Sequence, residues 1–164
     1  MPRTYEPIAS NTLGSAAADI TFTSIPGTYT DLVLVLNGGF ATNTSDLYIQ
    51  VGNSSIDTGS NYSNTDLRGN GSAAASSRTS SVAYMRQNQN TVDSPSTWVV
   101  NVMSYANANV FKTLLSSFAS AGNGVERTVS LWRSASAITE LKVYTSSGNL
   151  SSGFTASLYG IKAA

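Results

Sequence analysis

The chain has 164 residues, nine basic and nine acidic side chains, and a net charge of zero; only 11% of its residues are charged. Nucleic-acid backbones and polyanionic membrane surfaces are bound through many lysine and arginine contacts, so this composition argues against both as partners. Because the chain has no cysteine and no histidine, it lacks disulfides, zinc–thiolate sites and nucleophilic centres with a histidine base. We therefore expect no catalytic residue, no metal site and no cofactor.

The first nine residues, MPRTYEPIA, are predicted to form an extended N-terminal arm (1–9), followed by a single β-sandwich domain from 10 to 164. Pro2 and Pro7 cannot donate a backbone hydrogen bond to a central strand, and each restrains the residue before it to extended geometry. Tyr5 and Ile8 have apolar side chains, which would stay exposed to water if the arm were isolated. We therefore predict that these four residues form an interface with another subunit, with Tyr5 as the anchor. The alternative is that the arm packs back onto its own domain as an edge strand.

Residues 20–36, ITFTSIPGTYTDLVLVL, introduce the pattern of the domain. Ile20 and Phe22 alternate with threonines, and after a break at Pro26-Gly27 the segment 32–36 is apolar on both faces. Period-two alternation with β-branched and aromatic residues predicts strands. The same alternation recurs in residues 46–51, 97–103, 125–132, 138–144 and 154–161.

The segment 125–132, VERTVSLW, follows this alternation with one irregularity. Val125, Val129 and Leu131 share one face, and Arg127 is the exception on it.

Two other segments are harder to interpret. Residues 110–120 also fit a helical face, but their serines and threonines and the AGNG that follows favour a strand ending in a hairpin. The polar stretch 53–81 is predicted to hold one short strand inside two surface loops. With short turn clusters between segments, about ten strands predict an all-β, antiparallel two-sheet sandwich of jelly-roll-like type.

The tetrapeptide DTGS, residues 57–60, also occurs in the catalytic loop of aspartic proteases, where two carboxylates share a proton across a two-fold interface. That loop needs apolar strands on both sides to form a dry site, whereas NSSI and NYSN flank it here. We interpret the tetrapeptide as a turn in which Asp57 bonds its own backbone and Gly59 supplies a positive φ.

The remaining polar groups also have structural interpretations. Lys112, Lys142 and Lys162 lie on predicted strands beside polar neighbours, where a solvated charge is expected rather than the desolvated base of a Ser–Lys pair. The few acidic residues between 57 and 66 lack the spacing of an EF-hand calcium loop.

Five aromatic residues could stack against sugar rings: Trp98, Trp132, Tyr62, Tyr84 and Tyr144. The two tryptophans lie inside apolar segments, and large aromatic side chains dominate burial in protein cores. We expect both tryptophans in the core.

Four segments, taken together and in this order, resemble a group of small virion proteins of tailed bacteriophages, especially phages of cyanobacteria and marine bacteria. They are YEPIASNTLGSAAADITFTSIPGTYTDL (5–32), GSNYSNTDLRGNGSAAASSR (59–78), VERTVSLWRSASAIT (125–139) and SLYGIKAA (157–164). The resemblance covers most of the chain, and residues 82–111 match less clearly.

The resemblance implies a non-enzymatic β-sandwich that decorates or cements an icosahedral capsid, as a homotrimer that bridges subunits of the major capsid protein. The expected location is then the capsid surface of the virion, after synthesis in the cytoplasm of a bacterial host, and the arm would lie on a sister copy or on the coat protein. The alternative is a structural or carbohydrate-binding module of a tail fibre or spike, in which case carbohydrate is a partner.

Overall fold

The computed structural model describes residues 4–41, 45–90 and 96–162, with the side chains of residues 88–90 excepted, and these residues form twelve strands. They contain no helix that could span a membrane. The strands are β1 (Tyr5–Thr12), β2 (Asp19–Phe22), β3 (Asp31–Gly38), β4 (Ser45–Gly52), β5 (Tyr62–Gly69), β6 (Ala74–Val82), β7 (Met85–Asn90), β8 (Ser96–Met103), β9 (Lys112–Ser120), β10 (Gly124–Trp132), β11 (Glu140–Thr145) and β12 (Thr155–Ile161).

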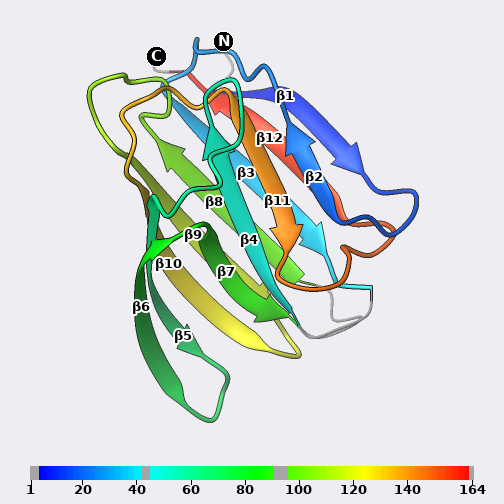
Figure 1. Ribbon diagram of the computed structural model, residues 1–164. Helices are drawn as coiled ribbons and strands as arrows, with labels where there is room; N and C mark the ends of the chain where they lie inside the picture. Colours follow the sequence, from blue (N-terminus) through cyan, green and yellow to red (C-terminus); the bar gives the residue numbers. More distant parts are fainter. Residues whose placement is uncertain (1–3, 42–44, 91–95, 163–164) are drawn as a thin grey trace.

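The strands form two antiparallel sheets that stack as a sandwich, as the sequence predicts, with twelve strands in place of about ten (Figure 1). The larger sheet has the order β1-β12-β3-β8-β9-β10-β5-β6, and the smaller has the order β2-β11-β4-β7. The connections β5–β6, β8–β9 and β9–β10 stay within the larger sheet, whereas each of the others passes from one sheet to the other. This repeated passage between layers gives the sandwich its jelly-roll-like character.

The core lies between the two sheets and is centred on Trp98, which is fully buried. Its indole ring packs against the rings of Phe40, Phe118 and Phe154, with centroid separations of 6.4, 5.3 and 6.1 Å. Trp132 is also buried, so the prediction that both tryptophans belong to the core is confirmed.

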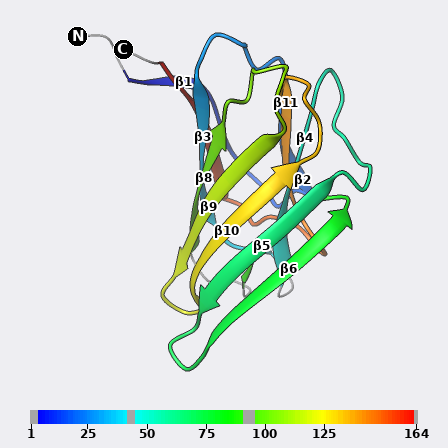
Figure 2. The ribbon, with the colours of Figure 1, turned by 90° about the vertical axis from the view of Figure 1, so that its left-hand side faces the viewer.

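The polar stretch 53–81 is folded differently from the sequence prediction. It supplies β5 and most of β6, a long hairpin, where one short strand between loops was expected. Strand formation here depends on pairing with β10 rather than on apolar alternation, because β5 pairs with β10 from Tyr62 to Gly69. The hairpin lies beyond β10 and forms one end of the larger sheet, as Figure 2 shows.

The segment 110–120 forms β9, and the AGNG that follows makes the predicted hairpin turn into β10. Gly124 closes this turn with a φ of 126°, and a Cβ at this position would lie 2.3 Å from the carbonyl oxygen of Gly69. Only glycine fits such a close approach between two backbones.

Candidate functional site: the outer face of the larger sheet

Strand β10 places its apolar residues on the outside of the sandwich. Val125 and Val129 are 60% and 48% exposed, whereas Glu126, Thr128 and Ser130 between and after them are buried. The prediction that Val125 and Val129 share a face is right, and this face points to solvent. Period-two alternation decides which residues share a face and leaves open which face points inward.

The polar residues of β10 are tolerated inside because they find partners there. Ser130 Oγ donates to Asn64 Oδ1 at 2.9 Å, and Thr128 Oγ1 donates to Glu126 Oε1 at 2.8 Å. Buried polar groups cost little when they are hydrogen-bonded. The inner face of β10 is therefore stable without apolar residues, which leaves its valines on the outer face.

Neighbouring strands extend this apolar surface on both sides of β10. Leu67 on β5 is 61% exposed and lies opposite Arg127, and Leu115 on β9 is 42% exposed and lies opposite Val129. We call Leu67, Leu115, Val125, Val129 and the enclosed Arg127 the outer patch. Scattered exposed aliphatic residues are normal, but a contiguous apolar patch over three strands is typical of an interaction surface.

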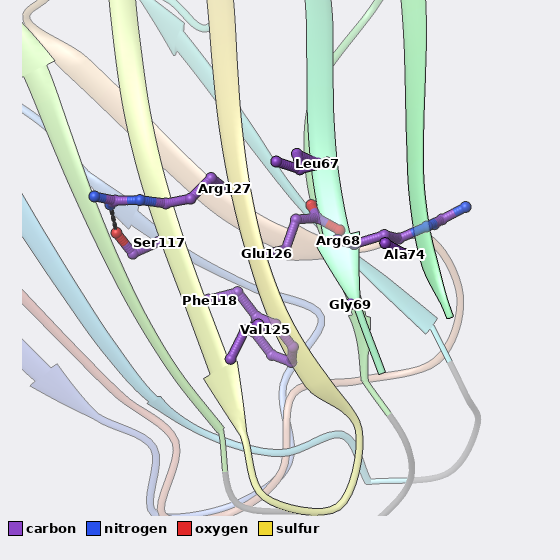
Figure 3. Close-up of a pocket in the computed structure, with 9 residues that line it drawn as sticks. All are labelled: Leu67, Arg68, Gly69, Ala74, Ser117, Phe118, Val125, Glu126 and Arg127. Carbon is purple, nitrogen blue, oxygen red and sulfur yellow. Dashed lines mark hydrogen bonds between the residues drawn. The ribbon is translucent and has the colours of Figure 1, made fainter. Parts of the chain in front are cut away.

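A shallow groove of about 530 Å³ covers part of the outer patch. It is lined by Leu67, Val125 and Arg127 of the patch, together with Arg68, Gly69, Ala74, Ser117, Phe118 and Glu126. Figure 3 shows the Arg127 side chain reaching from β10 toward β9, where its guanidinium donates to Ser117 Oγ. Arg127 forms no ion pair with any residue that the structure describes. The outer patch is thus an apolar surface with one unneutralised positive charge.

Directly behind the outer patch, Glu126 is buried beside Asp66. Burial raises the pKa of Glu126 above its usual range; the hydrogen bond from Thr128 lowers it, and the Asp66 carboxylate raises it further. The net direction is upward, so the protonated form of Glu126 is favoured by folding.

We expect Glu126→Gln to stabilise the protein at neutral pH, because glutamine imitates the protonated carboxyl. When folding raises the pKa of a carboxyl, the protein has its full stability below the pKa of that carboxyl in the unfolded chain, about 4.3. This stability is lost as the pH rises through the pKa in the folded protein. The gain at pH 7 should be on the order of 1 kcal/mol, which is about 2–4 °C in Tm. Thermal unfolding between pH 3 and 8 measures it, with Glu140→Gln on β11 as the surface control. A gain that persists unchanged at pH 3 would contradict this explanation.

The residues of the predicted N-terminal interface lie mostly in β1, which pairs with β12 of the same chain. Tyr5 is 55% exposed opposite Ile161, Pro7 sits at a bulge, and Ile8 packs against the core. Pro2 lies outside the described residues. The first strand therefore packs onto its own domain as an edge strand, which was the alternative to an extended arm. It continues to Thr12, past the predicted boundary at residue 9. Contact of Tyr5 with another subunit stays a prediction.

The DTGS segment forms the predicted turn, although its detail differs. The Gly59 amide donates to Asp57 Oδ1 at 2.8 Å, and Gly59 does not adopt a positive φ. The other carboxylate oxygen accepts hydrogen bonds from Asn61 Nδ2 at 2.9 Å and from Trp132 Nε1 at 2.7 Å. Partial burial raises the pKa of Asp57, but these three bonds outweigh burial and the net pKa is lowered. Asp57 therefore anchors a loop to the core tryptophan.

One of the three lysines is placed differently from the sequence prediction. Lys112 is fully buried rather than solvated, and its Nζ donates to the carbonyl oxygens of Asn107, Val110 and Ala135 at 2.6, 2.6 and 3.0 Å. Burial lowers the pKa of Lys112. The ammonium holds two loops together.

The other two lysines lie at the surface in ion pairs. Lys142 pairs with Asp19 and Lys162 pairs with Glu6, at 3.3 and 3.0 Å.

Among the described residues, no group of three or more His, Cys, Asp or Glu side chains could hold a metal ion.

Of the predicted sugar-stacking aromatics, Tyr62 is buried, and its hydroxyl oxygen lies 2.9 Å from the carbonyl oxygen of Val51 and 2.7 Å from that of Asp57. Tyr84 and Tyr144 instead come together with Tyr48 on the outside of the smaller sheet. Sequence reasoning missed Tyr48, although its position between the buried Leu47 and Ile49 marks it as outward-facing.

In comparisons with known proteins, no family model, no curated protein and no solved structure matches this chain.

Proposed function

We propose that this chain is a non-enzymatic structural protein that assembles through its outer patch. The observation that carries the proposal is the orientation of β10, which turns Val125 and Val129 outward while Glu126 and Thr128 are buried. Removing apolar surface from water is favourable by about 25 cal/mol per Å². A surface of this kind gains most when another protein surface covers it.

The charge at the centre of the outer patch favours a ring over a two-fold dimer. A two-fold contact centred on the patch would place Arg127 against Arg127 of the second copy, and like charges facing each other in an interface are unfavourable. A heterologous contact sets Arg127 against a different surface of the next copy, and a ring of three closes such contacts. This favours a closed ring over a two-fold dimer, and the number of three copies comes from the sequence resemblance.

The more specific proposal is a capsid decoration or cement protein, located on the capsid surface of a bacteriophage virion and bound to the major capsid protein. It rests on the sequence resemblance together with the outer patch. A decoration protein stabilises a shell by burying surface against several coat subunits at once, so its affinity comes from multivalent contact. Synthesis in the cytoplasm of the bacterial host belongs to the same proposal.

Image reconstruction of virions that carry this protein tests the proposal. We expect groups of three copies on the capsid surface, with the outer face of β5, β9 and β10 against the coat protein or a sister copy. Location in the tail would contradict the decoration role. Copies whose outer patch faces solvent would contradict assembly through that patch.

A further inference from the structure

A second surface, unrelated to the outer patch, lies on the outside of the smaller sheet. Tyr144 on β11 is the cross-strand partner of Tyr48 on β4. The Tyr48 and Tyr84 rings stack with centroids 4.0 Å apart and planes inclined by 9°, and the Tyr144 ring meets Tyr48 edge-on at 5.5 Å. All three side chains are partly exposed. They form a continuous aromatic surface, which we call the tyrosine cluster.

Polar groups suited to binding hydroxyls border the tyrosine cluster. Arg86, the cross-strand partner of Tyr48 on β7, bonds both carboxylate oxygens of Asp46, at 2.9 and 3.2 Å. The backbone amide of Asp46 donates to Ser146 Oγ at 3.0 Å. Burial and, second, the contact with Tyr84 together raise the pKa of Tyr48 to about 12, so the Tyr48 hydroxyl stays protonated and can donate or accept.

The charges around the tyrosine cluster are balanced in pairs. Arg86 is neutralised by Asp46, and Lys142, whose Nζ lies 5.3 Å from the Tyr144 ring centroid, is neutralised by Asp19. An anionic ligand would have to compete with these carboxylates for the cations. The surface therefore suits a neutral ligand that offers one apolar face and several hydroxyls.

We propose that the tyrosine cluster is a binding site for a neutral pyranose sugar. The C–H groups on one face of a pyranose carry positive partial charge and match the negative face of an aromatic ring. With the sugar against the tyrosine cluster, its hydroxyls bond the donors and acceptors of the Asp46–Arg86 pair that the two mutual hydrogen bonds leave unused. Aromatic contact with a few placed polar groups is the general composition of a small-ligand site.

This site and the outer patch are independent of each other. They lie on the outer faces of different sheets, which point away from one another (Figure 1). A copy whose larger sheet is covered by a partner keeps the tyrosine cluster open. Failure of sugar binding would therefore leave the proposed assembly untouched, and the reverse also holds.

Saturation-transfer difference NMR tests the site with the methyl glycosides of glucose, galactose, mannose and N-acetylglucosamine, each at millimolar concentration. We expect saturation to reach the ring protons of at least one of them. Tyr84→Ala should abolish the transfer, and Tyr84→Phe, which keeps the ring, should retain it. Tyr5→Ala removes an exposed tyrosine on the other sheet and should leave the transfer unchanged.

Three results would overturn the proposal. The first is no saturation transfer to any of the four glycosides. The second is transfer that survives Tyr84→Ala at full strength. The third is a stronger response to N-acetylneuraminic acid than to every neutral sugar, because the charge balance around Arg86 and Lys142 disfavours an anion.

Discussion

Replacing Lys112 by methionine is expected to lower the free energy of unfolding by about 3–5 kcal/mol, since it removes three hydrogen bonds from a buried ammonium to backbone carbonyls. Methionine fills a similar volume but cannot donate, so the carbonyl oxygens of Asn107, Val110 and Ala135 lose the ammonium that bonds them. A hydrogen bond to a charged group contributes about 1.5–3 kcal/mol, and the exposed backbone at Asn107 and Val110 recovers part of this by bonding water. The loops before β9 and after β10 should loosen together.

Chemical denaturation of Lys112→Met measures this loss. Lys142→Met is the control, because its ammonium is partly exposed and pairs with Asp19 at the surface, where an ion pair contributes about 0–1 kcal/mol. If the two variants lose equal stability, Lys112 does not hold the loops as described.

The second large effect is expected on assembly. Val125→Asp places a carboxylate in the outer patch, on β10 between its cross-strand partners Gly69 on β5 and Ala119 on β9. Taking a carboxylate out of water in an interface costs several kcal/mol, and an ion pair with Arg127 on the same face returns only part of this, so the net loss is about 3 kcal/mol; each 1.4 kcal/mol is a factor of ten in Kd. The dissociation constant of the assembly should therefore rise by about a hundredfold, as measured by analytical ultracentrifugation.

A matched control separates this interface effect from general damage to the fold. Val110 lies in the loop before β9 and is 43% exposed, so Val110→Asp makes the same chemical change on an exposed valine outside the outer patch. We expect Val110→Asp to assemble like the unchanged protein. Equal weakening by both variants would mean that the outer patch has no special role.

Sequence patterns predict most of the fold because the core strands obey them. Leu47, Ile49 and Val51 on β4 are all fully buried, as their alternation requires, and so are Leu141 and Val143 on β11. In these strands one face is apolar and the other polar, so only one orientation buries apolar surface. Local pattern and tertiary packing agree there.

The same reasoning fails on β5 and β10, where polar residues point inward. Asn64 on β5 is buried because its side chain accepts a hydrogen bond from Ser130 and another from the amide of Arg86. Those partners come from residues 22 and 66 positions away, so no local pattern reveals them. The consequence for β10 is the reversed orientation that exposes Val125 and Val129.

Part of the outer patch was nevertheless predictable. Leu114 and Leu115 are adjacent in a strand, and successive side chains point to opposite faces, so one leucine had to face outward. Leu67 is a single apolar residue in a polar strand, and only the register with β10 places it opposite Arg127. The tyrosine cluster likewise depends on the sheet order that sets β11, β4 and β7 side by side.

The central claim, that the outer patch is covered in the assembled state, can be tested with a single introduced thiol, because the chain has no cysteine of its own. Val125→Cys and Val110→Cys each give one reactive group on an exposed valine. Maleimide labelling of the assembled protein, alone and bound to capsids, should be much slower at position 125 than at position 110. Both should react at the same rate after unfolding in urea. Equally fast labelling at the two positions in every assembled state would contradict the claim.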